Sequence, residues 1–349
     1  MSFNSEVNVI VGDNGSGKTN LLDAIYMMSF CKSNFQHQDS FLVNYDEDFF
    51  RIAGDFEGTD NKLQMSIAFN AQKKKVIQVG DKKLDKLSDH IGQIPLVFIG
   101  PRDIQLIFEG STERRKFLDS GISQLNKVYL QQLVLYKKLL LRRNSYLKSC
   151  QPHTFDRAVI ESYNQQMLAP AQLLHNERIG FIDKLKPTFE STYKTLSGDN
   201  ETSSCLYRSQ LEKEPFQQLL ESSLEKDLVL QRTTTGIHKD DLIFKLNDKS
   251  LKKYGSEGQL KTYLLALKLS MWTELNKTAS ETPLLLLDDI FAKLDSHRVK
   301  NLLYFVREEC NAQVFISDTH MSRVSQILSE LNMNHSVFTV ENNEVNGQE

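Results

Sequence analysis

The chain has 349 residues, of which 40% are hydrophobic and 25% charged, and its formal net charge is −3. This composition is typical of a folded globular protein of about two domains and excludes a disordered chain. The slight negative charge gives no overall attraction to nucleic acid, so DNA binding would require a local basic surface. No apolar run reaches the roughly 18 residues of a membrane span, and no basic-then-apolar leader opens the sequence, so we expect a cytoplasmic protein with no membrane partner.

The first residues predict a strand, a glycine loop and a helix. Val7 to Val11 is β-branched and runs into Gly12, and Asn20 to Phe30 carries apolar residues at helical spacing. The segment between them fits G-x-x-x-x-G-K-[ST] in full, a pattern whose backbone N–H groups surround phosphates at a helix N-terminus. We therefore predict an ATP site in which Lys18 reaches the β- and γ-phosphates and Thr19 binds Mg²⁺. The predicted ATP-binding residues are Gly12, Asp13, Asn14, Gly15, Ser16, Gly17, Lys18 and Thr19.

The next segment changes to a period of two. Short runs at 51–56, 63–70 and 76–79 predict an antiparallel meander, and the apolar run 94–99 predicts a further strand that ends at Gly100-Pro101. Residues 102 to 229 show no strand runs and have helical spacing over 111–147, 155–186 and 215–228. We interpret them as an inserted helical lobe.

One stretch of this lobe is strongly basic. Between Asp119 and Asp156 there is no acidic residue, whereas lysines and arginines recur. Lys138, Arg142 and Arg143 are predicted as DNA-phosphate contacts along one helix stripe. A solvated helix face is an equally good interpretation of the same pattern.

Ser256-Glu257-Gly258-Gln259 precedes an apolar helix predicted over 260–275. A lone S-x-G-Q is more often a helix N-cap, but this one lies about thirty residues before an acidic strand. There, Leu284 to Leu287 ends at Asp288-Asp289. Asp288 is predicted to hold Mg²⁺ with Thr19 and Asp289 to orient the attacking water, so that Lys18, Asp288 and Asp289 are the catalytic candidates. The competing interpretation is an acidic turn after a core strand.

The order of these motifs is similar to that of ABC ATPases. By that similarity, Ser256, Gly258 and Gln259 form a signature segment that caps the γ-phosphate of a second subunit. Ala292-Lys293-Leu294-Asp295 resembles the D-loop, in which Asp295 reaches across the dimer interface. The strand 314–317 leads to the position of the switch histidine, where His320 is the candidate, although Asp318 or Thr319 fits equally and a solvated loop histidine is as good an interpretation.

The strand near 242–246 and a hairpin around 336–345 complete an α/β fold whose two ends build one domain. The predicted fold class is an ABC-type P-loop ATPase head, with a mixed sheet and an antiparallel β subdomain, and an inserted helical lobe that forms a short arm. The predicted domains are the N-terminal part of the head at 1–101, the helical lobe at 102–229, and the C-terminal part of the head at 230–349.

The amino-acid sequences of four segments resemble those of the RecF family of DNA replication and repair proteins: 12–25, 111–119, 235–241 and 287–295. The resemblance implies a weak ATPase used as a switch, ATP-dependent homodimerisation on double-stranded DNA and on single/double-strand junctions, and cooperation with RecR and RecO. It implies roles in recombinase loading at gaps, DNA repair, replication and the SOS response. Two departures stand out. Only eleven residues precede Gly12, where the family has some thirty, so about twenty are expected to be missing. Gly100-Pro101-Arg102-Asp103 stands in the place of the Q-loop glutamine, with Gln105 out of register.

Three other classes of protein share part of this pattern. Other ABC-type DNA-repair ATPases of the SMC and RecN group share the head, but their coiled-coil arms run to hundreds of residues, and this insert lacks sustained heptads. An ABC transporter subunit has a much shorter helical subdomain and a membrane partner. An interaction module with a decayed ATP site would not retain Lys18, Thr19, Asp288 and Asp289.

Overall fold

A computed structural model describes residues 1–58, 62–70, 72, 74–150, 155–198, 201–291, 296–319, 321–341 and 344–348. The chain divides into two compact units. The first, here called the head unit, comprises Met1–Ile104, Thr192–Asp199 and Glu257–Glu349. The second, the arm unit, comprises Gln105–Ser191 and Asn200–Ser256.

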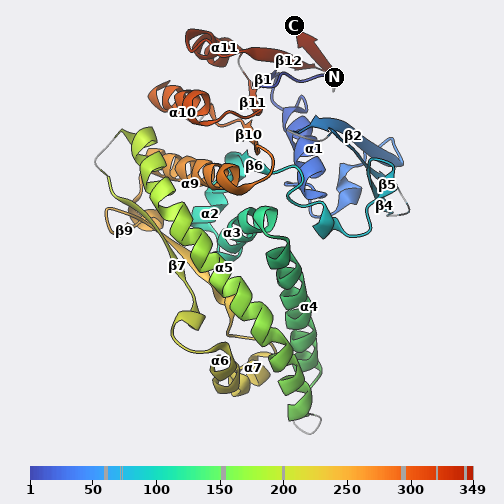
Figure 1. The fold of residues 1–349 in the computed structure, drawn as a ribbon, viewed down its shortest axis with the longest axis vertical. Coiled ribbons are helices and arrows are strands. Elements are labelled where there is room, and N and C mark those ends of the chain that lie inside the picture. The colour runs from blue at the N-terminus through green and yellow to red at the C-terminus, as the bar shows by residue number, and fades with distance from the viewer. Residues whose placement is uncertain are drawn as a thin grey trace. The chain divides into compact units, whose positions relative to one another are not determined.

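The head unit is built on a six-stranded sheet in the order β13-β12-β1-β11-β10-β6 (Figure 1). Its strands pair in parallel except for the antiparallel hairpin of β12 and β13. Every residue of β1 is buried, as expected for a central parallel strand that is apolar throughout. The strands are β1 (Val7–Val11), β6 (Leu96–Ile99), β10 (Leu284–Asp288), β11 (Val314–Asp318), β12 (His335–Glu341) and β13 (Glu344–Gln348).

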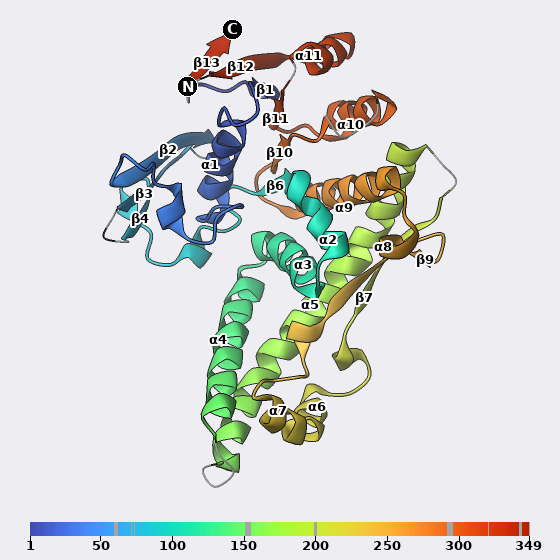
Figure 2. The same ribbon diagram turned by 180° about the vertical axis from the view of Figure 1, so that it is seen from behind.

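Helix α1 (Lys18–Phe30) lies between this sheet and a second one, as Figure 2 shows. On one side, Leu22 joins the core of the six-stranded sheet together with Ile10 and Phe98. On the other side, Met27 and Met28 pack into the core of the antiparallel four-stranded sheet. Because α1 is covered on two sides, its sequence is apolar over most of its circumference. The strands of the second sheet are β2 (Phe49–Glu57), β3 (Lys62–Asn70), β4 (Lys75–Val79) and β5 (Lys82–Lys83).

Three more helices belong to the head unit: α9 (Glu257–Thr278), α10 (Ser296–Glu309) and α11 (Met321–Glu330). Helix α9 is attached to the end of β6, because Lys268 Nζ donates to the carbonyl oxygen of Phe98 at 2.9 Å. Its Trp272 is buried and donates from the indole nitrogen to the carbonyl oxygen of Pro283 at 2.8 Å. Among the described residues, no helix is both long enough and apolar enough to cross a membrane.

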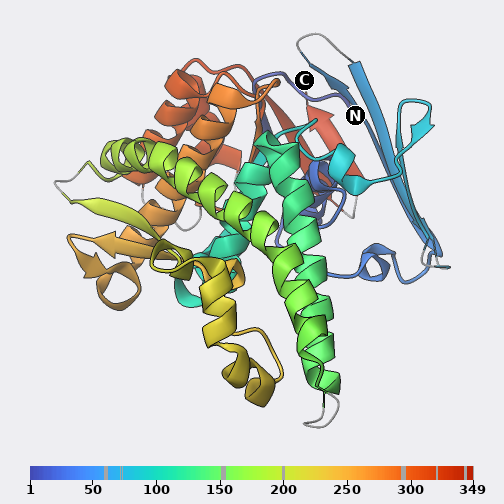
Figure 3. The same cartoon turned by 60° about the horizontal axis from the view of Figure 1, so that its bottom comes forward.

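The arm unit consists mainly of helices, with a small three-stranded sheet. In Figures 1 and 3 the long helices α4 and α5 run side by side, and they are joined where Arg143 Nε donates to Asn164 Oδ1 at 3.0 Å. The last turn of α5 belongs to the head unit. The helices are α2 (Gln105–Phe108), α3 (Ser111–Leu125), α4 (Lys127–Ser149), α5 (Arg157–Ser197), α6 (Phe216–Ser222), α7 (Leu224–Leu230) and α8 (Leu251–Tyr254), and the strands are β7 (Ser203–Arg208), β8 (Asp241–Leu246) and β9 (Lys249–Ser250). Short 3₁₀ helices occur at Asp39–Leu42, Leu87–Asp89, Pro101–Ile104, Gln210–Glu212 and Ile237–Lys239.

The fold class predicted from the sequence is confirmed by the mixed sheet, the antiparallel sheet and the helical insert. Two details differ. The segment 102–229, expected to lack strands, contains β7. The division expected at residue 229 falls instead at 256, because β8 pairs with β7, which keeps 230–256 in the arm unit.

Candidate nucleotide site

The phosphate-loop pattern lies between β1 and α1, as the sequence predicts. Gly17 has φ 108°, a left-handed conformation that a residue with a Cβ rarely adopts. A Cβ on Gly12 would collide with the carbonyl oxygen of Val340. Lys18 is buried, and its Nζ donates to the carbonyl oxygens of Gly12 at 2.6 Å and Asp13 at 2.8 Å. The loop is thus folded around its own lysine, whose ammonium is desolvated and next to the start of a helix.

The loop also has an unused polar atom. The buried Oγ of Ser16 has no hydrogen-bond partner among the described residues. An orphaned buried hydroxyl costs free energy, so its presence indicates that a ligand completes it. Together with the N-terminus of α1, where N–H groups are left without intrahelical partners, this arrangement fits an anion such as a phosphate.

The acidic strand end lies against the start of α1. Thr19 Oγ1 is 3.1 Å from each carboxylate oxygen of Asp288, to which it donates. Asp288 pairs in register with Ser317 on β11, and Ser317 Oγ donates to Asp288 Oδ1 at 2.7 Å. Burial raises the pKa of Asp288, the hydroxyls of Ser317 and Thr19 lower it, and the charge of Asp289 raises it. A carboxylate and a hydroxyl are oxygen ligands that Mg²⁺ prefers, so Thr19 and Asp288 fit such an ion.

Asp289 has an unusual backbone conformation. Its φ is 47°, a left-handed value that Asp tolerates better than most residues, and its backbone N–H donates to Ser317 Oγ at 2.9 Å. Strained residues of this kind gather at functional sites. Ser317 therefore contacts both aspartates, Asp288 at its carboxylate and Asp289 at its backbone N–H. The sequence pattern did not point to Ser317, which ends the strand predicted at 314–317.

Other predicted site residues are placed as follows. Gly258 lies in the first turn of α9, where an added Cβ would be 3.1 Å from Arg298 Nη1, so this glycine lies next to a guanidinium. Ser256 immediately precedes α9, and Gln259 is in its first turn. Asp295 and His320 lie outside the described residues.

At the position expected for the Q-loop, the side chain of Asp103 bonds within the protein. Asp103 forms an ion pair with Lys268 of α9, with Nζ and Oδ1 2.7 Å apart. Its Oδ2 also accepts from the backbone N–H of Gly100 at 2.9 Å. These contacts attach the turn after β6 to α9.

The basic stripe predicted on α4 needs a correction. Arg143 is fully buried, with 0% of its side chain exposed, and its Nη1 is 2.7 Å from Asp227 Oδ2. It is therefore unavailable to a phosphate, and the prediction that it contacts DNA is wrong for this structure. Lys138 and Arg142 are exposed.

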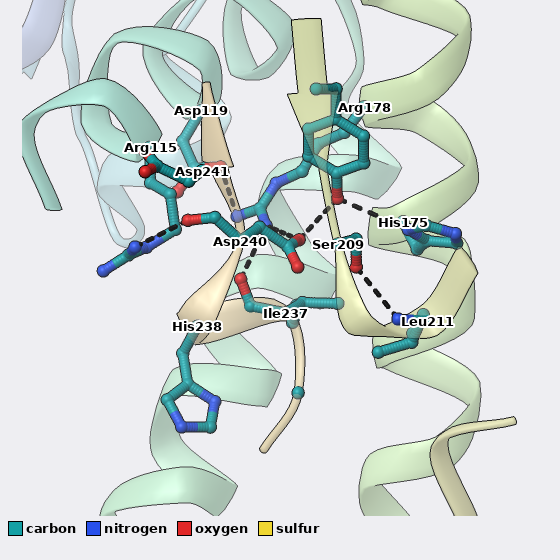
Figure 4. Close-up of polar contacts among 12 residues, drawn as sticks. Arg115, Asp119, His175, Arg178, Ser209, Leu211, Ile237, His238, Asp240 and Asp241 are labelled. Atoms are coloured by element: carbon teal, nitrogen blue, oxygen red, sulfur yellow. Dashed lines mark hydrogen bonds and ion pairs between the residues drawn. The ribbon is translucent and has the colours of Figure 1, made fainter. Parts of the chain in front are cut away.

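A second set of buried ion pairs in the arm unit is centred on Arg178 (Figure 4). Arg178 is 2.8 Å from Asp119 and 2.7 Å from Asp240, and it also donates to the hydroxyl of Tyr129 at 3.1 Å. Tyr207 donates to Asp240. Burial raises the pKa of Asp240, and Arg178 is the strongest of the groups that oppose this rise. Asp119 and Asp240, one from each of the family-like segments 111–119 and 235–241, thus belong to the interior of the arm.

The family comparisons agree with this geometry. The model of the RecF/RecN/SMC N-terminal domain family matches residues 1–346. The DNA replication and repair protein RecF of Flavobacterium johnsoniae is 40% identical over 339 residues, which cover 97% of this chain and 94% of that protein. RecF of Parabacteroides distasonis is 40% identical over 347 residues, covering 99% and 94%.

Solved structures are similar as well. The structure of the recombination mediator protein RecF with ATP, in the RecFOR pathway, matches with a TM-score of 0.89 at 29% identity, covering 100% of this chain and 93% of that one. An Smc head bound to the C-terminal winged-helix domain of ScpA matches with a TM-score of 0.58 at 12% identity, a likeness of fold alone.

The sheet order, the phosphate loop and the aspartate pair define the ABC-type ATPase head of the RecF/RecN/SMC class. Within this class, identity over nearly the whole length decides the assignment. The chain belongs to the RecF family of DNA replication and repair proteins.

Proposed function

We propose that this protein is an ATP-dependent DNA-binding switch of the cytoplasm that dimerises with ATP on DNA, hydrolyses ATP slowly and promotes recombinase loading at gaps. The observation that carries the proposal is the Thr19–Asp288–Ser317–Asp289 cluster beside an intact phosphate loop. The side chains of Thr19, Asp288 and Ser317 are hydrogen-bonded to one another across α1, β10 and β11, which a site without a ligand would not require.

Each residue has a defined task. The Lys18 ammonium neutralises phosphate charge, and the Ser16 hydroxyl and the N–H groups at the start of α1 bind phosphate oxygens. Thr19 and Asp288 would hold Mg²⁺, which supplies charge neutralisation at the phosphates. Asp289 orients the attacking water and accepts its proton.

The dimer part of the proposal concerns the start of α9. We place Ser256, Gly258 and Gln259 of one subunit over the γ-phosphate held by another, since a helix start supplies N–H donors for an anion. Asp295 and His320 remain candidates for the interface and the switch. Partners of the complex would be RecO and RecR, because a similar structure is described as RecF of the RecFOR pathway.

DNA, double-stranded or at single/double-strand junctions, is the other proposed partner. The surface predicted from Lys138, Arg142 and Arg143 is not kept in that form, since Arg143 is buried. DNA binding is therefore assigned to the ATP-bound dimer as a whole. Family membership suggests that this binding serves DNA repair, replication and the SOS response.

Gel filtration with light scattering, with and without ATP and Mg²⁺, tests the proposal. The wild type should shift from monomer to dimer with ATP, and Lys18→Ala should not. Ser256→Arg should bind ATP as a monomer and fail to dimerise, because it places bulk and positive charge at the cap. A Ser256→Arg protein that still dimerises with ATP would show that the site is not shared between subunits.

A further inference from the structure

The outer face of α4 combines apolar and basic side chains. Its inner residues, among them Tyr136 and Leu139, are buried in the arm. The opposite side of the helix carries Val134, Leu135, Lys138, Leu141 and Arg142, which share one face because residues three, four and seven apart are neighbours on a helix. We call these five residues the outer face of α4.

Three of these side chains are large, apolar and exposed. The exposed fraction is 56% for Val134, 41% for Leu135 and 70% for Leu141. A single exposed aliphatic residue is ordinary, but three within eight positions on one stripe form a contiguous patch. Since the inner face of α4 already supplies the arm core, folding of the chain does not require these three. A contact outside the arm is the simplest reason for them.

The charge of the outer face is positive and uncompensated. The sequence has no acidic residue from 120 to 155. Lys137, on the side of the helix, is 3.8 Å from Asp119. Among the described residues, no ion pair within 4 Å involves Lys138 or Arg142. Their charges are therefore available to a partner.

Four occupants can be compared by chemistry. DNA phosphates would satisfy Lys138 and Arg142 but gain nothing from the valine and leucines. A second copy of the face would oppose like charges. A membrane surface favours basic residues on a polar face separate from the apolar one, whereas here they are interleaved. An amphipathic helix that alternates apolar residues with Asp or Glu along one face satisfies both components, because Lys138 and Arg142 lie between Leu135 on one side and Val134 and Leu141 on the other.

We propose that the outer face of α4 is a docking surface for an acidic amphipathic helix of a partner protein. Val134, Leu135 and Leu141 provide the apolar contact, and Lys138 and Arg142, which lie between them on the face, pair with the acidic residues. Docking at the outer face of α4 requires neither the nucleotide site nor dimerisation.

A labelled synthetic peptide tests it by fluorescence anisotropy with the full chain. The probe is a helix of about three heptads that presents leucine and glutamate in alternation along one face. One control peptide replaces leucine with serine, and another replaces glutamate with lysine. We expect only the leucine–glutamate peptide to bind, with an affinity that falls as salt is raised.

Two double variants separate the components: Val134→Gln with Leu141→Gln, and Lys138→Gln with Arg142→Gln. Each should weaken peptide binding by about tenfold or more, while Val229→Gln, an equally apolar change at an exposed site on α7, should not. Failure of the leucine–glutamate peptide to bind, or equal binding of the serine–glutamate peptide, would overturn the proposal. The proposal would also be overturned if Lys138→Gln with Arg142→Gln abolished binding to duplex DNA while Val134→Gln with Leu141→Gln still bound the peptide. The outer face of α4 would then contact phosphate.

Discussion

Two neighbouring arginines of α4 offer a direct test of the arm's interior. Arg143 is 0% exposed and Arg142 is on the surface, so the same substitution to glutamine at each position isolates the effect of burial. Arg143→Gln removes the ion pair to Asp227 at 2.7 Å and the hydrogen bonds to Thr233 at 2.8 Å and Asn164 at 3.0 Å. Asp227 has 0% of its side chain exposed, so its charge would remain buried without a cationic partner.

The expected cost of removing one partner of such a pair is about 3 to 5 kcal/mol. For a unit of this size it corresponds to a fall in melting temperature of roughly 10 °C or more. Arg142→Gln should change the stability by no more than about 0.5 kcal/mol, because surface substitutions away from special features rarely do more. Urea denaturation followed by circular dichroism, with calorimetry to resolve the two units, measures both.

A further variant distinguishes a lost ion pair from a general packing defect. In the double variant Arg143→Met with Asp227→Leu, both charges are gone, so it should be more stable than Arg143→Gln alone. Equal stability losses for Arg142→Gln and Arg143→Gln would refute the reasoning and restore Arg143 to the surface.

Three other predictions concern the nucleotide site and pH. Lys18→Ala should lower ATP affinity by at least about tenfold in calorimetry, whereas Asp289→Asn should bind ATP normally and hydrolyse it about 100-fold more slowly or worse; equal turnover would remove Asp289 from the chemistry. Ser317→Ala should reduce the hydrolysis rate about tenfold with little change in ATP affinity, because it releases both aspartates; an affinity loss alone would contradict this. Burial lowers the pKa of His238 to about 4, so stability should be lost as pH falls from about 6.5 towards 4, by at most about 3 kcal/mol, and His238→Gln should flatten that part of the stability curve.

Much of the head unit could be predicted from the sequence because the patterns that define its elements are local. The apolar run Val7–Val11 and the glycine pattern after it define a strand and a loop without reference to any distant residue. The acidic strand end could be placed beside the loop because such loops need a carboxylate there. Ser317 was not singled out, since a serine at the end of a strand carries no sign of the strand that will lie next to it.

The arm was harder to predict, for a physical reason. Arg143 and Arg142 are adjacent and chemically identical, but Arg143 lies on the buried side of α4, four residues after Leu139, and its partner Asp227 is 84 residues away. Strand β7 was missed because its residues, Ser203 to Arg208, are mostly polar or small, and the strand exists through its pairing with β8. Long-range partners of this kind leave no periodic pattern in one segment.

The position of α1 between two cores has a consequence for the motion of the phosphate loop. Local opening of this helix would expose Leu22 on one side and Met27 and Met28 on the other, so it requires disruption of both sheets at once. Its amide protons should therefore exchange only when the head unit unfolds as a whole. A nucleotide arriving at the loop therefore meets backbone donors at the start of α1 that are already in place.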